Sequence, residues 1–566
     1  MRAPLLVLLG AYALSIGGLV LIPGLDDKGN LWYFDFFHAF YFVSFMGSTI
    51  GFGEIPYPFS GGQRLWTTIS LYICVISWLY AIGSILAIVQ DPAFRRVVRE
   101  QRFTRRVRRL TSPFYLVCGY GETGSLLVSA LHRRNIQSVV IDIDSERINR
   151  LELEDFNFDI PCLSCDAREV KHLQEAGIEH PCCIGVIALT DNEDVNVKIA
   201  ITSKLLRPQL KVICRAENRS TAANLASFNT DHIIDPFTIF ADHLAMALRA
   251  PSVHLLYKWL ISVPNLPLPT AIRPPRGAWV VCGFGRFGRA VHRYLGFEGI
   301  DLKVIEPDID QAPDGAIIGR GTEAVTLREA GIEKAVGIVA GTDIDINNLS
   351  IVMTAREQNP DLFLVARQNR RSNDPIFQAA DLDLIMQASR IIVWRILPLL
   401  MTPLLGRFLR NARHHNEEWA NGVLGRLRAI CATSTPLTWA LEITTAQAPA
   451  VVQALQVGYS VKLDTLLREP RDRECELPCV ALLLVRGDEQ IELPTPEQRL
   501  RYGDTLLLSA PPEVAERMQW NLFNYNAINY ILTGETRPDG YIWRWLARRR
   551  ALRNDTPAPS DSSAEL

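Results

Sequence analysis

The sequence predicts a membrane-embedded helical part at the N-terminus, followed by two α/β domains of one type and a smaller α+β unit. Two apolar segments, residues 4–22 and 65–90, are each long enough to cross a bilayer. A Gly-x-Gly-x-x-Gly motif occurs twice further along the chain, each time after a strand-like apolar run. A chain of 566 residues is too long for one hydrophobic core, which agrees with several domains.

Composition narrows the class of protein. The formal net charge is −2, so the overall balance gives no argument for a nucleic-acid partner. The 11 cysteines are scattered, which is typical of a reducing cytosol rather than of a disulfide framework. The Cys162-x-x-Cys165 pair has no second ligand pair at zinc-site spacing, so the sequence assigns no metal.

The first apolar segment, residues 4–22, is predicted to be a transmembrane helix. A signal peptide is the alternative, because Arg2 precedes the segment and Ala11–Ala13 could pass for a cleavage site. The apolar run continues well beyond that site, which favours a membrane span. Residues 65–90 are the second predicted span. The aromatic stretch 32–47 between the spans is predicted to be a re-entrant pore helix that enters the bilayer partway.

The stretch between the pore helix and the second span is predicted to line an ion pathway. Its alternating glycines can adopt backbone angles that other residues avoid, so successive carbonyl groups can point the same way. A ring of such strands, one from each subunit, replaces the hydration shell of a potassium ion. A glycine-rich surface turn is the alternative, and the two flanking spans disfavour it. The predicted K+ selectivity filter consists of Thr49, Ile50, Gly51, Phe52 and Gly53, in a pore domain over residues 1–94.

An arginine-rich stretch, residues 95–112, is predicted to link the second span to the soluble domains. Positive charge directly after a span marks the cytoplasmic side of a membrane. Two spans then leave both termini and the soluble domains in the cytoplasm. The arginines also suit contact with anionic membrane lipid.

The first soluble domain, predicted over residues 113–262, begins like a dinucleotide-binding fold. A buried strand runs into Gly119, Gly121 and Gly124, which open a helix, and the next strand ends at Asp142. Such glycines allow close approach of the backbone, the helix N-terminus attracts phosphate, and the strand-end acid suits ribose hydroxyls.

The same unit recurs over residues 278–408, after a Pro-rich linker at 263–277 that is predicted to be stiff and extended. Its second strand ends at Glu306, which favours NAD over NADP because a carboxylate suits a free 2′-hydroxyl. Its motif glycines are Gly283, Gly285 and Gly288.

The two copies differ at the turn. Glu122 in the first copy is predicted to repel a pyrophosphate, whereas Arg286 and Arg289 in the second copy attract it. We therefore expect the second copy to be the better nucleotide site. A turn with a purely structural role is the alternative in each copy.

The repeated units resemble RCK domains, also called TrkA-N or KTN domains, which regulate prokaryotic potassium channels and transporters. The resemblance rests on the glycine motif, the strand-end acid, Cys165–Ala167 in place of Gly-Asp-Ala, the repeated Glu-Ala-Gly-Ile at 175–178 and 329–332, and an Asp/Asn-rich loop. Thr49–Gly53 likewise resembles the Thr-Val-Gly-Tyr-Gly signature of potassium channels, with Phe52 in place of Tyr. Together these features resemble a two-transmembrane potassium channel with tandem RCK domains, the GsuK- and MthK-like group.

The resemblance implies a homotetramer in a prokaryotic inner (cell) membrane, with four chains around one pore and eight RCK domains in a ring beneath it. It also implies a regulatory ligand, either NAD(H) or an adenine nucleotide. Calcium (Ca2+) bound near Asp142, Asp144 and Glu154 is an open alternative. The candidate cofactor-binding residues are Gly283, Gly285, Arg286, Phe287, Gly288, Glu306, Thr322, Thr342 and Arg367 in the second copy, and Gly119, Gly121, Gly124, Asp142, Asp166, Thr190 and Arg215 in the first.

Residues 420–515 are predicted to form an α+β unit that resembles the C-terminal subdomain of RCK proteins. Strand-like runs such as Val480–Val485 alternate with turns there. Residues 516–566 are predicted to be a tail. Its end, Thr556–Leu566, is predicted to be disordered because it is polar and rich in Pro and Ser.

The leading hypothesis is a channel that conducts potassium passively and is gated by nucleotide binding to the RCK ring. A membrane-tethered NAD-dependent oxidoreductase is a second hypothesis, because the dinucleotide folds permit it. It lacks a recognisable catalytic constellation and leaves the glycine-rich stretch unexplained, so we do not expect an enzyme. A Trk/Ktr-like transport component is a third hypothesis. Such pores need four filter segments in one chain, and this sequence has one.

Overall fold

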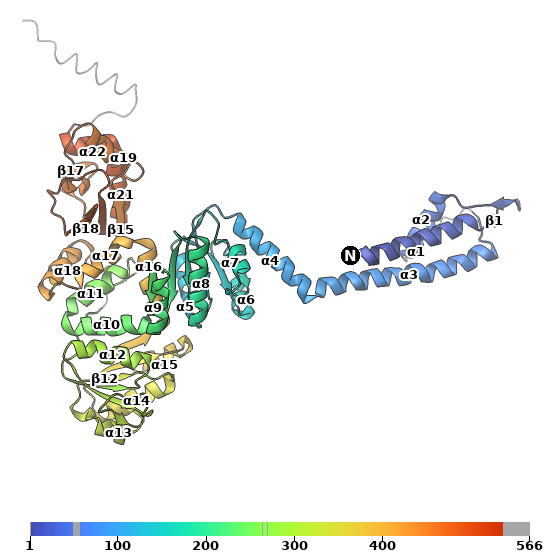
Figure 1. Ribbon diagram of the computed structural model, residues 1–566. Coiled ribbons are helices and arrows are strands. Elements are labelled where there is room, and N and C mark those ends of the chain that lie inside the picture. The colour runs from blue at the N-terminus through green and yellow to red at the C-terminus, as the bar shows by residue number, and fades with distance from the viewer. Residues whose placement is uncertain (1, 49–56, 263, 269, 536–566) are drawn as a thin grey trace, which may run out of the picture. The chain divides into compact units, whose positions relative to one another are not determined.

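The computed structural model describes residues 2–48, 57–262, 264–268 and 270–535 of the chain. They form two compact units, residues 1–110 and 111–566, which are described separately (Figure 1). The predicted selectivity filter, Thr49–Gly53, lies outside the described residues. The predicted disordered end, Thr556–Leu566, also lies outside them.

The first unit is helical apart from a short antiparallel turn. Helices α1 and α3 are each long and apolar enough to cross a membrane, which agrees with the two predicted spans. Helix α3 begins four residues before the predicted span because Ser60 and Gln63 form a capping box at its N-terminus. The elements are α1 (Arg2–Leu21), β1 (Gly24–Leu25), β2 (Leu31–Trp32), α2 (Phe36–Gly47), α3 (Gly61–Gln90) and α4 (Pro92–Arg108).

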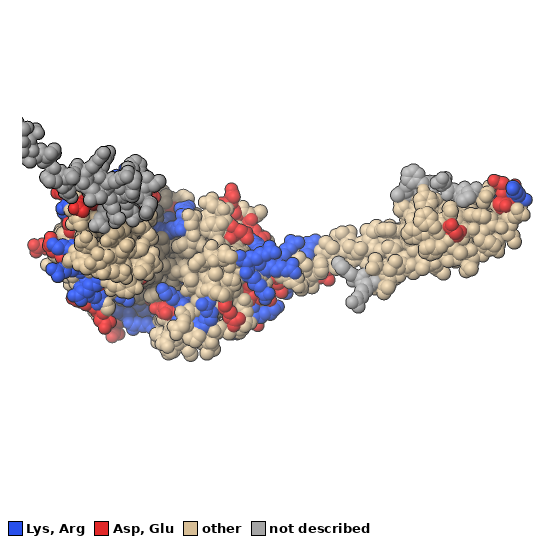
Figure 2. Space-filling view, turned by 90° about the horizontal axis from the view of Figure 1, so that it is seen from above, with Lys and Arg blue, Asp and Glu red and all other residues tan. Residues whose placement is uncertain are grey.

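Much of the predicted arginine-rich linker is a regular helix. The Asp91 side chain accepts a hydrogen bond from the backbone N–H of Ala93 at 2.7 Å and so caps α4. Pro92 follows at the first helical position, where its missing N–H costs nothing. The arginines therefore project from a structured element, and charge gathers over α4 in Figure 2.

Helices α1 and α3 pack closely together. A Cβ on Gly18 would lie 2.0 Å from the ring of Trp66, so only glycine fits there. The indole of Trp66 donates to the Ser15 carbonyl at 3.1 Å, and the indole of Trp78 donates to the Tyr12 hydroxyl at 3.0 Å. These bonds satisfy polar groups that have no water partner inside a bilayer.

The outer surface of α1 and α3 is strongly apolar. Leu6, Ile76 and Leu79 are each more than 60% exposed. Figure 2 shows few charged side chains over this unit, apart from the end that carries the β1–β2 turn and the region of α4. An exposed apolar surface of this extent requires lipid or further subunits around it.

The second unit contains two parallel sheets with the same strand order. The first sheet runs β5-β4-β3-β6-β7-β8, and the second runs β11-β10-β9-β12-β13-β14. The order reverses beside β3 and beside β9, which is where ligands bind in doubly wound folds. The first sheet comprises β3 (Phe114–Cys118), β4 (Gln137–Asp142), β5 (Cys162–Ser164), β6 (Cys183–Ala188), β7 (Lys211–Arg215) and β8 (His232–Ile234). The second comprises β9 (Ala278–Cys282), β10 (Asp301–Glu306), β11 (Ile317–Ile318), β12 (Gly337–Ala340), β13 (Phe363–Gln368) and β14 (Leu384–Gln387).

Helices cover these sheets (Figure 1). The first copy has α5 (Glu122–His132), α6 (Ser145–Leu153), α7 (Val170–Glu175), α8 (Glu193–Leu206) and α9 (Arg219–Ser227). The second has α12 (Arg286–Phe297), α13 (Ala324–Glu329), α14 (Asp345–Gln358) and α15 (Asp374–Ala379), with short 3₁₀ turns at Ile332–Lys334 and Arg371–Asn373.

The helix that follows each sheet packs against the sheet of the other copy, so the packed units differ from the predicted domains 113–262 and 278–408. Helix α10 (Pro236–Arg249) follows the first sheet in sequence, yet its Phe240 and Leu244 are buried in the core of the second sheet. Helix α16 (Ala388–Met401) follows the second sheet, yet its Ile392 and Ile396 are buried in the core of the first. Neither copy therefore completes its hydrophobic core by itself.

Three further helices join the copies to the C-terminal part: α11 (Pro251–Ile261), α17 (Pro403–Ala412) and α18 (Glu417–Cys431). The Pro-rich linker, predicted to be extended, instead turns at residues 264–266, where Asn265 has a φ of +67°, and then pairs with the chain just after α18. The backbone N–H of Asn265 donates to Thr435, and that of Leu268 donates to Thr433. The linker is therefore part of the packed structure rather than a free spacer.

The C-terminal part has a four-stranded antiparallel sheet, β15-β20-β18-β19, a separate pair, β16-β17, and covering helices. Its packed helices extend to residue 533, beyond the predicted boundary at 515. Val514, Met518 and Leu522 recur every four residues and are buried in this core. The strands are β15 (Leu437–Glu442), β16 (Arg468–Glu469), β17 (Asp472–Glu476), β18 (Val480–Arg486), β19 (Glu489–Glu492) and β20 (Thr505–Ala510). The helices are α19 (Pro449–Gln456), α20 (Leu463–Leu466), α21 (Pro512–Phe523) and α22 (Tyr525–Thr533).

Candidate functional site

The first glycine-rich turn joins β3 to α5 in the geometry of a phosphate-binding turn. Gly119 has a φ of +105°, which favours glycine, and a Cβ there would lie 3.0 Å from the backbone of Leu189 and Thr190. A Cβ on Gly124 would lie 2.0 Å from the Gly119 carbonyl oxygen, so this glycine lets the helix approach the strand. Asp142 ends β4 and accepts hydrogen bonds from the backbone N–H of Tyr120 at 2.5 Å and of Asp144 at 2.7 Å.

A cleft of about 400 Å³ opens beside this first turn. Its size lies within the range of small-molecule sites, roughly 300–1,000 Å³. Arg147 of α6 lies in the cleft, 3.2 Å from the position of a Cβ on Gly121. The predicted residues Gly119, Gly121, Asp142, Asp166 and Thr190 all line the cleft.

Two charged residues near this cleft, Arg147 and Glu122, bear on phosphate binding. Arg147 places a guanidinium over the turn, where it also contacts Asp142 at 3.7 Å and Asp144 at 3.3 Å. Glu122, predicted to repel a phosphate, accepts a hydrogen bond at 3.1 Å from the backbone N–H of Arg371 in the second copy. The first turn is therefore more favourable to an anion than its sequence indicates.

The second turn, between β9 and α12, has the same backbone. Gly283 has a φ of +91°, and a Cβ on Gly288 would lie 1.9 Å from the Gly283 carbonyl oxygen. Glu306 accepts from the backbone N–H of Phe284 at 2.5 Å, as Asp142 does in the first copy. Gly285 has an ordinary φ of −67°, and a Cβ there would meet nothing within 4 Å. The backbone thus does not require glycine at 285, and the open space leaves room for a ligand.

The repeated Thr and Asn residues form a clamp between strand ends. Asn196 is fully buried, and its amide donates to the carbonyls of Thr190 at 3.0 Å and Arg215 at 3.1 Å. Asn348 holds Thr342 and Arg367 in the same way at 2.9 and 2.7 Å. The sequence identity between the copies at these positions is therefore explained by the shape of the loop that follows the central strand.

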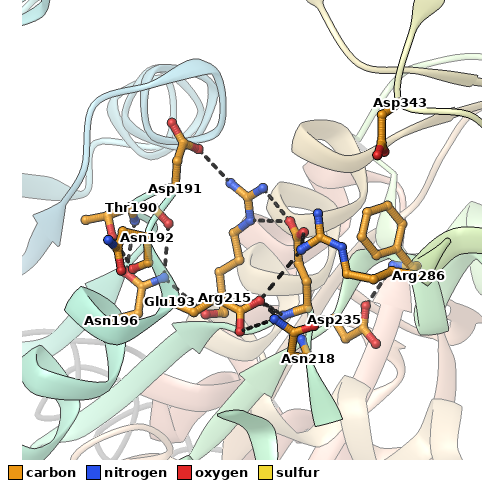
Figure 3. A network of polar contacts seen from close by, with 12 residues as sticks. Thr190, Asp191, Asn192, Glu193, Asn196, Arg215, Asn218, Asp235, Arg286 and Asp343 are labelled. Atoms are coloured by element: carbon orange, nitrogen blue, oxygen red, sulfur yellow. Dashed lines mark hydrogen bonds and ion pairs between the residues drawn. The ribbon is translucent and has the colours of Figure 1, made fainter. Parts of the chain in front are cut away.

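A charged network connects the second turn to the first copy (Figure 3). Arg286, predicted to attract pyrophosphate, instead contacts Glu217 at 2.5 Å and Glu193 at 3.9 Å. Arg215 also donates to Glu217, with its Nε at 2.9 Å from the carboxylate oxygen. The Glu217 side chain is 7% exposed and that of Arg286 is 46% exposed, so the contact is only partly screened by solvent.

Phe237 completes this network. The guanidinium carbons of Arg286 and Arg367 lie 5.5 and 4.8 Å from the centre of its ring, which suits a cation–π contact. Burial lowers the pKa of Arg367, which is nevertheless paired with Asp343 at 2.5 Å. Burial opposes a low pKa at Glu193, but hydrogen bonds from Thr221, from the Glu217 N–H and from Asn218 keep the pKa of that carboxyl below its ordinary value.

The surroundings of three other candidates, Phe287, Thr322 and Asp166, limit how each could contact a ligand. Phe287 is fully buried in the core beneath the second sheet, so only its backbone, in the first turn of α12, is available to a ligand. Thr322 follows Gly321, where a Cβ would lie 2.7 Å from the Cys282 sulfur. Arg168 contacts Asp166 at 2.7 Å and, mainly through that side-chain hydrogen bond, lowers the pKa of the Asp166 carboxyl.

Arg147, Glu193 and Glu217 were not among the site residues predicted from the sequence. Arg147 carried a weak signal, because it follows the strand-end Asp142 on the next helix. Glu217 carried none, since the equivalent position of the second copy is Asn369.

In the part of the chain that the structure describes, no group of three or more His, Cys, Asp or Glu could hold a metal ion. The calcium alternative therefore gains no support.

Comparison with known families identifies the repeated domains. The TrkA-N domain model matches residues 115–236 and again residues 279–388. This confirms both predicted repeats, and the chain therefore carries two TrkA-N domains.

The chain is also similar to named potassium channels. It is 28% identical to potassium channel protein 1 of Methanocaldococcus jannaschii over 220 residues. The aligned region covers 39% of this chain and 64% of that protein. It is 25% identical over 249 residues to the probable potassium channel protein 2 of the same organism, which covers 44% of this chain and 67% of that protein. For the voltage-gated potassium channel Kch of Escherichia coli the identity is 24% over 219 residues, covering 38% of this chain and 50% of Kch. The chain thus spans less than two-thirds of the length of potassium channel protein 1 and half of Kch.

Solved structures give a weaker likeness across more of the chain. The GsuK channel bound to NAD is 17% identical with a TM-score of 0.47, covering 92% of this chain and 97% of that one. The human SLO3 gating ring is 11% identical with a TM-score of 0.39, covering 71% of this chain. The fold and the sequence matches define the class: a protein with tandem TrkA-N (RCK) domains and two helices of membrane-crossing length. Within that class, its sequence relatives are prokaryotic potassium channels.

Proposed function

We propose that this chain is one subunit of a potassium channel whose gate is regulated by a nucleotide bound to its TrkA-N domains. The observation that carries the proposal is the joint presence, in one chain, of a channel-like N-terminus and two TrkA-N domains. In that N-terminus, the short apolar helix α2 lies between α1 and α3, and the glycine-rich sequence 49–53 follows it. Four chains together would supply the ring of carbonyls that potassium needs. Both termini and the TrkA-N domains would lie in the cytoplasm, because the arginines of α4 follow the second span.

The first turn offers a preformed site for the nucleotide. The backbone N–H groups at the start of α5 and the guanidinium of Arg147 would hold the phosphates. Each oxygen of Asp142 already accepts one backbone N–H and retains a second acceptor site, which suits ribose hydroxyls. NAD(H) and adenine nucleotides share the pyrophosphate and ribose that these residues would recognise.

The second turn would couple binding to the contact between the copies. A phosphate there competes with Glu217 for Arg286, so binding at the second turn would release the Arg286–Glu217 contact. A ligand shifts a conformational equilibrium only through its different affinity for the two states. The broken contact supplies such a difference, because the arrangement with Arg286 free would bind nucleotide more tightly.

Potassium flux from liposomes that contain the purified protein tests the proposal. We expect selective potassium flux that changes on addition of NAD or ADP. Gly121→Asp should abolish the part of the nucleotide response that depends on the first turn, and Gly285→Asp the part that depends on the second. Potassium flux itself should persist in both variants. Equal sodium and potassium permeability, or no flux under any condition, would refute the channel. Turnover of NADH with a carbonyl substrate would favour a membrane-tethered oxidoreductase instead.

A further inference from the structure

A partly open pocket lies where the exchanged helices of the two copies meet. It is formed by α10, α11, β14 and α16, and no residue of either glycine-rich turn lines it. Its volume is about 100 Å³. A buried water needs roughly 10–15 Å³ by this measure, so the pocket has room for about seven atoms of water size. The pocket is thus large enough for a small organic molecule and too small for a nucleotide.

The polar groups that line the pocket are all cationic or neutral. They are His243, His254, Tyr257, Lys258 and Arg395. The other lining residues, including Phe240, Leu244 and Trp394, are apolar, and no carboxylate is among the lining residues. A ligand that matched this lining would have one anionic end and an apolar body.

Neither Lys258 nor Arg395 forms an ion pair with the described residues, and burial lowers the pKa of the Lys258 ammonium. Lys258 is half-buried and forms no ion pair or hydrogen bond with the described residues. Arg395 donates to the Tyr257 hydroxyl at 3.0 Å, and that hydroxyl is a neutral partner. The nearby carboxylate of Asp242 is paired with Arg413, and Arg395 attracts it more weakly, without an ion-pair contact. Buried or half-buried charges are normally paired, so two cations without an ion-pair partner at one pocket indicate an anionic ligand.

His254 adds an independent indication of a ligand. Its side chain is 5% exposed, and its Nδ1 is buried without a hydrogen-bond partner among the described residues. Burial lowers its pKa to about 3, so the ring is neutral at physiological pH and can donate a hydrogen bond from one nitrogen. A buried polar atom without a partner can be satisfied by a water molecule or by a ligand in the pocket.

We propose that this pocket binds an amphipathic carboxylate with a short apolar chain. The carboxylate lies against Lys258 and Arg395, and the chain lies against Phe240, Leu244 and Trp394. Since the pocket is bounded by the helices that the two copies exchange, an occupant braces the junction between the copies. This inference is independent of the nucleotide sites and of the pore.

Isothermal titration calorimetry of the full chain in detergent, with hexanoate as the probe, tests the proposal. We expect saturable binding with one hexanoate per chain. Lys258→Met should weaken that binding roughly 10- to 100-fold, because it removes a charge-assisted hydrogen bond. The matched control is Lys303→Met, which removes an exposed lysine on β10 and should leave the affinity unchanged. Hexanol and hexylamine should bind much more weakly than hexanoate.

The proposal would be overturned if hexanoate showed no saturable binding, if hexanol bound with the same affinity as hexanoate, or if Lys258→Met bound hexanoate as tightly as the unchanged protein. It would also be overturned if inorganic phosphate displaced hexanoate. This last outcome would identify a plain anion site. Melting temperatures of the variants show whether each one folds. A second variant, Leu244→Ala, enlarges the apolar end without touching the charges and should shift the preference from hexanoate toward octanoate. Retention of the original preference by this variant would also count against the pocket.

Discussion

Replacing Glu217 by Gln should strengthen nucleotide binding at the second turn. In the structure Arg286 contacts Glu217 at 2.5 Å, so a phosphate can use Arg286 only after this contact breaks. Glutamine keeps the shape of the side chain and removes its charge. Arg286 is then free to meet a phosphate, and a negative charge near the site is lost.

The expected gain follows from the exposure of the two side chains. The Glu217 side chain is 7% exposed, but that of Arg286 is 46% exposed, so solvent screens part of the attraction. Such partly exposed pairs contribute about 1 kcal/mol. The dissociation constant for nucleotide at the second turn should therefore fall by about fivefold.

Calorimetric titration with ADP in a Gly121→Asp background measures this effect at the second turn alone. The matched control is Glu298→Gln, which removes the carboxylate of another partly exposed ion pair, with Arg249 at 3.3 Å. This variant should leave ADP binding unchanged. Arg286→Gln should weaken binding and cancel the effect of Glu217→Gln in the double variant. The reasoning fails if Glu217→Gln leaves the ADP affinity unchanged while Arg286→Gln lowers it, because Arg286 would then reach phosphate without leaving Glu217.

Three further predictions concern the protein's stability and its second turn. Gly288→Ala places a Cβ 1.9 Å from a backbone carbonyl and should lower the free energy of unfolding by about 2–4 kcal/mol in denaturant titration. Gly285→Ala places a Cβ in open space, so it should lower the free energy of unfolding by less than about 1 kcal/mol while weakening ADP binding. Equal destabilisation by Gly288→Ala and Gly285→Ala would contradict a packing role for Gly288 and a ligand-binding role for Gly285. Asn196→Ala removes the clamp between two strand ends and should cost about 2–4 kcal/mol, measured by thermal unfolding; a loss below 0.5 kcal/mol, roughly that of a surface change, contradicts the clamp. Because burial lowers the pKa of His254 from 6.5 to about 3, the unfolded chain binds a proton more readily over that range, so stability should fall as the pH drops below 6.5. His254→Phe should flatten this decline, and an unchanged slope would show that His254 does not contribute to it.

Much of the organisation was predictable because it depends on local patterns. Residues 4–22 and 65–90 are apolar over a length that matches the bilayer, and the structure has helices there. Gly119 and Gly283 must adopt a positive φ, so the sequence marks both turns with glycine. The strand-end acids Asp142 and Glu306 lie where their spacing placed them.

Features that depend on which segments meet in space were not predictable. The charge of Arg286 indicated phosphate, but Glu217, 69 positions earlier, is its partner in the fold. Helix α21, which lies beyond the predicted boundary at 515, packs on the C-terminal core, and its apolar face became evident only with the elements that bury it.

The sequence by itself determined that the chain has two apolar spans and two copies of a nucleotide-binding fold, since glycine, charge and hydrophobic length act within a few residues. Only the tertiary structure decided that α10 and α16 change places between the two cores. Apolar periodicity specifies that a helix must bury one face, but it does not specify against which sheet. That choice placed Arg286 beside Glu217 and formed the cationic pocket between the copies.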